Sequence, residues 1–192
     1  MSSSPSVLFC LSGSIACYKA CTVISRLAQA GVQVRVVATA AALKFVGPAT
    51  LEGLSGHRIY TDLWEEGRAL DHIALARQSD LAILCPATAH TLNRMAGGLA
   101  DDLVGSLFLA WGDPRGRPWW VVPAMNGFMW EHPATQASVA RLEGWGVTVA
   151  SPEVGAHACG EDGPGRFPDP EKLAARVLAA LAALPPRLPD QP

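Results

Sequence analysis

Five short apolar segments, separated by stretches of helical periodicity, constrain the fold of this chain more than any other feature of its sequence. Most of them are rich in Val, Leu and Ile and lack polar alternation, which is typical of strands buried on both faces of a sheet. Between the first two, Val23, Ile24 and Leu27 lie at helical spacing. Gly31 follows at the position of a C-cap glycine. The predicted strands are 7–11, 32–38, 81–85, 119–122 and 147–150.

The helical stretches between these segments predict an α/β fold. Strands that alternate with helices form a parallel, doubly wound sheet of the Rossmann-like or flavodoxin-like type, with right-handed crossovers and helices on both faces. Ligands of such sheets bind beyond the carboxyl ends of the strands. The further predicted helices are 73–79, 88–96, 100–111, 133–143 and 170–184.

Two regions do not follow this alternation. Residues 47–71 show weak periodicity, so their structure stays open at this point. Residues 151–169 contain four glycines and three prolines, which predicts a long loop without regular structure. Such loops in compact domains usually act as lids or binding loops, or are disordered. The length of 192 residues fits one domain, so we expect a single domain over 1–184 and a disordered, proline-rich tail over 185–192.

The charge balance and the cysteines exclude several classes of function. Lys and Arg total 15 against 17 Asp and Glu, so no basic field is expected to attract nucleic acid or an anionic membrane. The uncharged stretches 81–93 and 118–130 are shorter than the about 20 residues of a spanning helix. No basic residue precedes the short apolar segment 7–11, as one would in a signal peptide. The five cysteines are scattered without a CxxC pair, which predicts reduced thiols, a cytoplasmic location, and neither a metal site nor a disulfide framework.

Small polar residues follow three of the predicted strands. Gly13 and Ser14 lead from the first strand into a helix, whose free N-terminus suits one phosphate. A turn glycine and a capping serine would explain them equally well. Thr88 and Thr91 follow the third strand at a helix start, where capping alone explains one of them. Asn126 follows the fourth strand as either a helix cap or a ligand of a carboxylate. Together the three strand ends indicate a ligand site more strongly than any one of them.

Two further residues have chemistry suited to proton transfer. His72 precedes a predicted helix and is a candidate base because its ordinary pKa lies near neutral pH, although exposure or simple capping is the more frequent role of such a histidine. Cys159 lies in a polar, glycine-rich loop, whereas the other cysteines are expected to be small core residues. Glu161 and Asp162 beside it disfavour a thiolate, so Cys159 is expected to act as a proton donor rather than as a nucleophile.

Six motifs, in their order and spacing, resemble the flavin-dependent cysteine decarboxylase family over nearly the whole chain, from Val7 to about Leu184. Within that family the resemblance is greatest to the branch that acts on phosphopantothenoylcysteine in coenzyme A biosynthesis. Each motif alone is weakly diagnostic, whereas the six in register are specific. The motifs are Gly13-Ser14-Ile15-Ala16, His72-Ile73, Pro86-Ala87-Thr88-Ala89, Gly98-Leu99-Ala100-Asp101-Asp102-Leu103, Pro123-Ala124-Met125-Asn126 and Ala158-Cys159-Gly160-Glu161.

The resemblance implies a site built around FMN and a small-molecule substrate. His72 takes the position of the family's active-site histidine, Asn126 that of the residue that holds the substrate carboxylate, and Cys159 that of the acid on a flap over the substrate. Met125 and Ala158 are the neighbouring substrate-binding positions. The family also implies trimers, often assembled further into dodecamers, with FMN near a subunit interface. The implied positions of FMN contact are Gly13, Ser14, Ile15, Thr39, Thr88, Ala89, His90, Thr91 and Ala124.

The reaction that the resemblance implies is FMN-dependent decarboxylation of 4′-phosphopantothenoylcysteine to 4′-phosphopantetheine. Oxidation of the CH₂ beside sulfur gives a thioaldehyde, whose C=S accepts the electrons that CO₂ leaves behind, and the hydride then returns, so no net electron acceptor is needed. Two alternatives stay open: a decarboxylase of a C-terminal peptide cysteine, as in lantibiotic modification, and a non-catalytic flavin-fold binding or regulatory protein. The alanine of the PAMN motif and the ACGE loop favour the coenzyme A branch, while an intact His72, Asn126 and Cys159 favour catalysis.

Overall fold

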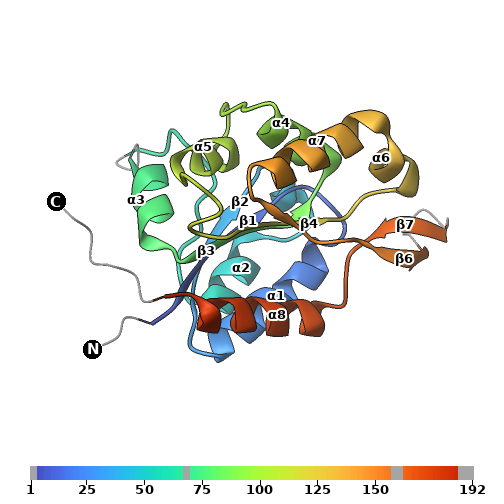
Figure 1. Cartoon of the computed structure of the whole chain (residues 1–192). Coiled ribbons are helices and arrows are strands. Elements are labelled where there is room, and N and C mark those ends of the chain that lie inside the picture. Colours follow the sequence, from blue (N-terminus) through green and yellow to red (C-terminus); the bar gives the residue numbers. More distant parts are fainter. Residues whose placement is uncertain (1–3, 67–69, 157–161, 186–192) are drawn as a thin grey trace.

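The strands predicted from the sequence form one parallel sheet in a computed structural model that describes residues 4–66, 70–156 and 162–185 (Figure 1). The strand order is β2-β1-β3-β4-β5, and every neighbouring pair is parallel. The chain turns outward from β1 to β2 and then returns to β3, so the topological switch point lies between β1 and β3. This order confirms the predicted doubly wound fold. The strands of the sheet are β1 (Ser6–Leu11), β2 (Gln33–Ala38), β3 (Leu81–Ala87), β4 (Trp119–Pro123) and β5 (Thr148–Val149).

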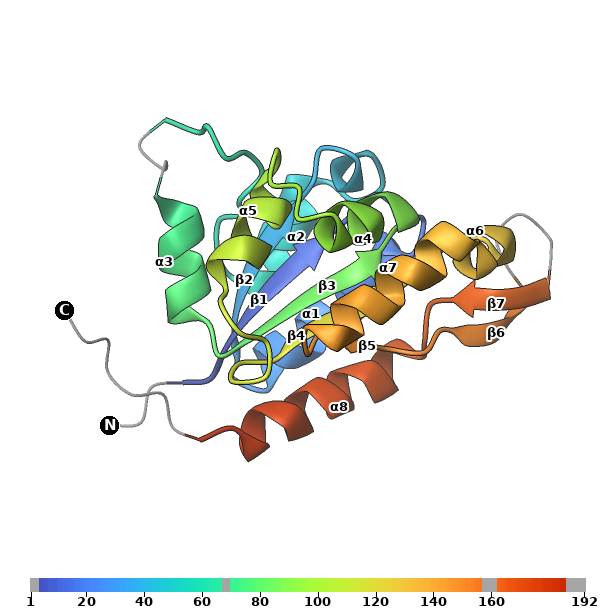
Figure 2. The same ribbon diagram turned by 45° about the horizontal axis from the view of Figure 1, so that its top comes forward.

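Helices cover both faces of this sheet (Figures 1 and 2). The helices α1, α2 and α8 lie on one face, and α3, α4, α5 and α7 lie on the other. The predicted helix boundaries agree with the structure to within three residues, whereas α2, α6 and the 3₁₀ turn η1 are additions. None of the described helices has the length and apolar character needed to span a bilayer. The helical segments are α1 (Cys17–Gln29), η1 (Ala42–Lys44), α2 (Pro48–Ser55), α3 (Asp71–Gln78), α4 (Ala89–Ala96), α5 (Leu103–Ala110), α6 (Gly127–Glu131), α7 (Pro133–Gly144) and α8 (Pro170–Ala183).

The central strands are buried on both faces, because successive side chains of a strand point to opposite sides. In β1, Val7 and Phe9 belong to the apolar layer under α1 and α8, whereas Leu8 and Cys10 belong to the layer under α4, α5 and α7. Burial raises the pKa of the Cys10 and Cys85 thiols, so both stay protonated. This environment confirms the prediction that these two cysteines are small core residues.

The prediction of an irregular loop over 151–169 is wrong. There β6 (Glu153–Ala156) and β7 (Asp162–Arg166) form an antiparallel hairpin that projects beyond the carboxyl edge of the sheet (Figure 2). Glycine and proline lower β propensity, so the composition of this segment predicted a loop. The two strands nevertheless pair through their backbones, which requires no apolar side chains. In the region left open, the chain forms α2 and a parallel bridge between Val37 and Tyr60 beside β2. The tail predicted over 185–192 lies outside the described residues from 186 onward.

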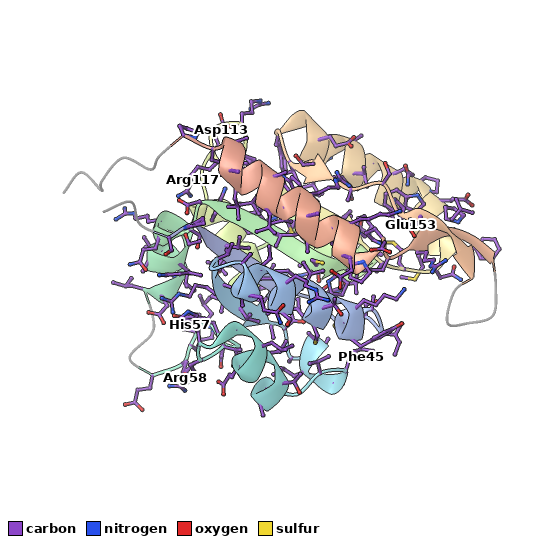
Figure 3. The ribbon with its side chains drawn as sticks, turned by 90° about the horizontal axis from the view of Figure 1, so that it is seen from below. Phe45, His57, Arg58, Asp113, Arg117 and Glu153 are labelled. Atoms are coloured by element: carbon purple, nitrogen blue, oxygen red, sulfur yellow. The ribbon has the colours of Figure 1, made fainter. Side chains whose placement is uncertain are left out.

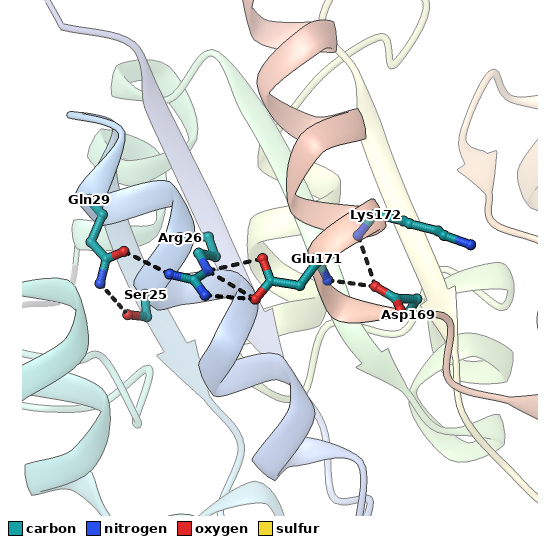
Figure 4. A network of polar contacts seen from close by, with 6 residues as sticks. All are labelled: Ser25, Arg26, Gln29, Asp169, Glu171 and Lys172. Carbon is teal, nitrogen blue, oxygen red and sulfur yellow. Dashed lines mark hydrogen bonds and ion pairs between the residues drawn. The ribbon is translucent and has the colours of Figure 1, made fainter.

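Polar contacts fix α8 against α1, on the face seen from below in Figure 3. The Arg26 Nε of α1 lies 2.9 Å from both carboxylate oxygens of Glu171 (Figure 4). Asp169 caps α8 by accepting from the backbone N–H groups of Glu171 and Lys172 at 2.9 and 3.0 Å, and the hydrogen bond from Lys172 lowers the pKa of Asp169. Glu153 of β6 accepts from the Asp169 N–H at 3.1 Å, so the base of the hairpin is tied to the start of α8 (Figure 3).

Candidate functional site

A cavity of about 540 Å³ opens at the carboxyl edge of the sheet, among the ends of β1, β2 and β3 and the starts of α4 and α5. Its volume lies in the range of small-molecule sites, about 300–1,000 Å³. Apolar side chains, hydroxyl groups, one imidazole and one carboxylate make up its wall. The lining residues are Gly13, Val37, Ala38, Thr39, Ala40, Ala41, Thr61, Thr88, His90, Thr91, Asp102, Leu103, Val104 and Met129.

Gly13 lets the turn after β1 approach the turn after β2. A Cβ built on Gly13 would lie 2.5 Å from the Ala41 Cβ and 3.0 Å from the Ala41 carbonyl carbon, well inside normal contact distance. The facing turn is itself ordered by Thr39, whose Oγ1 accepts from the Ala42 N–H at 3.2 Å. Gly13, Thr39 and Ala41 all line the cavity. The glycine therefore permits the close approach of the two turns and also forms part of the cavity wall.

The N-terminus of α4 places the hydroxyl groups of Thr88 and Thr91 at the cavity. Its Oγ1 accepts from the Thr91 N–H at 3.4 Å and lies 3.2 Å from the Thr91 Oγ1. Thr88 is therefore the N-cap of α4, as the capping interpretation predicts. The partial positive charge at this helix N-terminus adds to the neutral donors of the two threonines.

Ser12 joins the end of β1 to the end of β3 beneath Thr88. Its Oγ donates to the Pro86 carbonyl at 2.8 Å and accepts from the Thr88 N–H at 2.9 Å. The Ser12 backbone N–H also donates to the Pro86 carbonyl, at 3.2 Å. Ser12 is 1% exposed and does not line the cavity. Sequence reasoning did not single it out, because its only signal there is its place directly before Gly13.

Asp102 is a second residue whose place sequence reasoning missed, although it belongs to one of the six motifs. It lines the cavity and caps α5, with its Oδ1 accepting from the Gly105 N–H at 2.8 Å. A Cβ on Gly105 would lie 2.3 Å from the Leu99 carbonyl oxygen, so the turn before α5 requires glycine there. An Asp directly before an apolar run is a recognisable helix start, and that signal could have identified this cap. Thr61, also missed, lies in the region whose structure the sequence left open.

Five of the nine predicted FMN positions line the cavity, and they come from the ends of three strands. Ser14 lies outside its lining, where its Oγ donates to the Ala124 carbonyl at 3.3 Å. The N-cap residue of α1 is Ala16 rather than a serine, but the Ser14 Oγ accepts from the Ala16 N–H at 3.3 Å, so Ser14 makes a capping-type contact at the start of the helix. The positions that line the cavity are Gly13, Thr39, Thr88, His90 and Thr91, and the others are Ser14, Ile15, Ala89 and Ala124.

His72 does not line the cavity of its own chain. It lies in the first turn of α3, which begins at Asp71, two residues earlier than predicted, so the expectation that His72 precedes the helix is wrong. Its Nδ1 is buried and has no hydrogen-bond partner among the residues that the structure describes. Nearby, Leu70 is 71% exposed and Ile73 is 36% exposed, so two apolar side chains are exposed at the start of this helix.

Asn126 and Met125, two of the predicted substrate-binding positions, are not among the residues that line the cavity. Asn126 caps α6, with its Oδ1 accepting from the Phe128 N–H at 2.8 Å. The Met125 N–H donates to the Gly165 carbonyl at 3.0 Å and so joins the turn after β4 to β7. Ala158 and Cys159, predicted for substrate contact and proton donation, lie outside the described residues. Within the described parts of the chain, no group of three or more His, Cys, Asp or Glu side chains is arranged to hold a metal ion.

Curated proteins match the chain over most of its length. The bifunctional coenzyme A biosynthesis protein CoaBC of Bacillus subtilis is 41% identical over 184 residues, which are 93% of this chain and 44% of that protein. The chain thus spans less than half the length of this relative. The probable phosphopantothenoylcysteine decarboxylase of Streptococcus mutans is 39% identical over 177 residues, which are 91% of this chain and 98% of that protein.

Solved structures share the fold over a similar length. A PPC decarboxylase mutant complexed with pantothenoylaminoethenethiol has a TM-score of 0.83 at 29% identity, over 94% of this chain and all of that chain. The FMN binding protein AtHal3 has a TM-score of 0.81 at 29% identity, over 95% of this chain and all of that one. The epidermin biosynthesis protein EpiD from Staphylococcus aureus has a TM-score of 0.76 at 27% identity, over 89% and 99%. The family model called Flavoprotein matches residues 1–182, and the chain belongs to this family.

Proposed function

We propose that this chain is an FMN-dependent decarboxylase that converts 4′-phosphopantothenoylcysteine to 4′-phosphopantetheine and CO₂ in coenzyme A biosynthesis. The observation that carries the proposal is a ligand-sized cavity at the switch point of a sheet that belongs to a flavoprotein family. The relative of matching length, the Streptococcus mutans protein, is named for this activity. The proposed location is the cytoplasm, in keeping with cysteines that are free among the described residues.

The composition of the cavity fits a flavin mononucleotide. Val37, Val104 and Met129 supply apolar walls suited to a flat ring system. The hydroxyl groups of Thr39 and Thr88, with the N-terminus of α4, supply donors suited to the ribityl chain and the phosphate. Since no Lys or Arg is among the described lining residues, neutral O–H and N–H groups would hold that phosphate. FMN, when bound, supplies a hydride acceptor for the CH₂ beside the substrate sulfur and a hydride donor after CO₂ has left.

Asn126 is proposed to hold the substrate carboxylate while it caps α6. The hydrogen bond from the Phe128 N–H fixes the plane of the amide through Oδ1. The amide group also carries N–H donors, the kind of group that a carboxylate accepts from. A fixed amide orients the carboxyl group before CO₂ leaves, which is the positioning that such a reaction needs.

Cys159 is proposed to protonate the carbon of the enethiolate that CO₂ loss produces. The mutant PPC decarboxylase, in which a serine replaces a cysteine, is complexed with an enethiol, the kind of molecule expected when that proton is not delivered. In this chain Cys159→Ser is expected to release CO₂ but to accumulate a product two hydrogens lighter than 4′-phosphopantetheine. Mass spectrometry of the products measures this, and normal product at the parent rate would exclude Cys159 as the required donor.

His72 is proposed to assist ionisation of the substrate thiol from a neighbouring subunit of a trimer. It does not line the cavity of its own chain, and the exposed Leu70 and Ile73 beside it offer an apolar surface to a second copy. Mixing inactive His72→Asn subunits with inactive Asn126→Asp subunits should restore part of the activity, because hybrid trimers contain some intact sites. Hybrids that stay inactive would place both residues in the same chain's site.

The experiment that tests the function starts from the purified protein. We expect a yellow protein with about one FMN per chain that releases CO₂ from 4′-phosphopantothenoylcysteine. A colourless protein that takes up no added FMN would remove the basis of the proposal. A flavoprotein that decarboxylates only a C-terminal peptide cysteine would belong to the lantibiotic type, and one that decarboxylates neither substrate would be a binding or regulatory protein.

A further inference from the structure

We propose that Ser12 is a positioning residue that sets the flavin affinity of the cavity from beneath its wall. It touches no ligand, since it is 1% exposed and absent from the lining. The role assigned to it is to hold Thr88, and through Thr88 the hydroxyl of Thr91, in place. This inference rests on the proposed flavin function.

The hydrogen bonds of Ser12 span the switch point of the sheet. Its one hydroxyl proton goes to the Pro86 carbonyl at 2.8 Å, and its lone pair receives the Thr88 N–H at 2.9 Å. The Oγ atoms of Ser12 and Thr88 are also only 3.2 Å apart. A single side chain therefore links the ends of β1 and β3, two of the three strands whose ends surround the cavity.

The main chain at Ser12 is itself held by contacts with α1 and with the turn after β2. The Cys17 thiol, in the first turn of α1, donates to the Ser12 carbonyl at 3.3 Å. The next residue, Gly13, fits against Ala41 with no room for a Cβ. The main chain at Ser12 is thus fixed by α1 and by the turn after β2, so its hydroxyl is a rigid anchor for Thr88.

Removal of the Ser12 hydroxyl would affect the hydrogen bonding of the Thr88 N–H most. The Pro86 carbonyl would keep the bond from the Ser12 backbone N–H at 3.2 Å, but the Thr88 N–H would lose the acceptor that Ser12 provides. A partly buried donor that loses its acceptor is unfavourable, so the backbone there is expected to shift toward another acceptor or water. Because Thr88 and Thr91 both line the cavity, that shift would displace two of its hydroxyl groups.

Ser79 offers a matched control elsewhere in the same molecule. It is also 1% exposed, and its Oγ donates to the Leu75 carbonyl at 2.9 Å at the end of α3. Ser79 precedes β3, whereas the cavity lies beyond the strand's other end. Ser79→Ala therefore removes a comparable buried hydroxyl without touching the turn that carries Thr88.

The test compares Ser12→Ala, Ser12→Thr and Ser79→Ala with the parent protein. FMN affinity is measured by fluorescence titration of the apoprotein, stability by thermal unfolding, and the anchor itself by hydrogen exchange of the Thr88 amide without FMN. We expect Ser12→Ala to bind FMN about tenfold more weakly, about 1.4 kcal/mol, and to lose protection at Thr88. Ser12→Thr keeps the hydroxyl and should keep the affinity even if its added methyl lowers the Tm, while Ser79→Ala should lower the Tm and keep both the affinity and the protection.

Equal FMN affinity in Ser12→Ala and the parent would overturn the proposal, as would an equal loss in Ser79→Ala. Unchanged protection of the Thr88 amide in Ser12→Ala would overturn it as well. If the parent protein binds no FMN, the proposed function fails by itself. The exchange measurement still decides in that case whether Ser12 anchors Thr88.

Discussion

The two faces of the central sheet are closed to different extents. On the face under α1 and α8, here called the sealed face, Val23, Leu27 and Val177 are fully buried, and the polar contacts between the helices lie at the rim. The other face, here called the open face, is equally apolar at its centre but ends in the cavity, whose wall includes Leu103 and Val104 from its own core layer. From this contrast we expect that stability and ligand binding can be altered separately in this domain.

The largest expected effect is on turnover and comes from Asn126→Asp at the carboxyl edge. Asp caps a helix as well as Asn does, so α6 and the fold should persist. A negative charge about 4 Å from the substrate carboxylate, at an effective dielectric near 20, repels it by about 4 kcal/mol, roughly a thousandfold in affinity. Steady-state kinetics measure the loss, with FMN content and Tm as controls. Unchanged turnover would mean that the substrate carboxylate binds elsewhere.

On the sealed face, Leu27→Ala should change stability alone. Leu27 is fully buried between α1 and the sheet, and such truncations typically reduce the free energy of unfolding by about 2–5 kcal/mol. Urea unfolding measures that loss, and an FMN titration of the folded variant should match the parent. A parallel drop in FMN affinity would show that the two faces are coupled, which would break the comparison.

Gly13→Ala should affect both properties, because the turn after β1 meets the cavity. The added Cβ has to displace Ala41, and crowding of this kind costs about 1–3 kcal/mol. FMN affinity should fall with it, since the displaced turn lines the cavity. The matched control is Gly53→Ala in α2, where an added Cβ has no neighbour within 4 Å. That variant should leave FMN affinity unchanged and raise the Tm slightly, as replacement of a helical glycine usually does.

Asp169→Ala, at the rim of the sealed face, should have the smallest effect and a characteristic pH dependence. The pKa of Asp169 is lowered by its hydrogen bond from the Lys172 N–H, so its stabilisation is present above the ordinary aspartate pKa of about 3.9 and is lost as the pH falls through the lowered value. We expect a Tm about 2–4 °C below the parent at pH 7, with the two values converging in acid. A constant difference at all pH values would exclude the carboxylate cap as the cause.

The sequence predicted the parallel sheet because its strands are buried on both faces and therefore read as continuous apolar runs. The sequence did not predict β6 and β7, because their glycine and proline residues are typical of loops, whereas the two strands pair through their backbones. Strand ends located Thr88 and Thr91 at the cavity, and the family resemblance added Thr39, which also lines it. Thr61 and Ser12 were out of reach, because one lies in a segment without periodicity and the other acts through hydrogen bonds to residues distant in sequence.

The close approach of Gly13 and Ala41 has a consequence for redesign of the cavity. Positions 13 and 41 share one small volume, so the size permitted at either depends on the occupant of the other. Space for a bulkier cofactor can be made only at position 41, because the glycine at position 13 has no side-chain atoms that could be removed. Ala41→Gly would remove the closest contact of an alanine at position 13, the one at 2.5 Å, but the Ala41 carbonyl carbon and oxygen would still lie 3.0 and 3.1 Å away. An alanine at position 13 therefore also requires the main chain at position 41 to move.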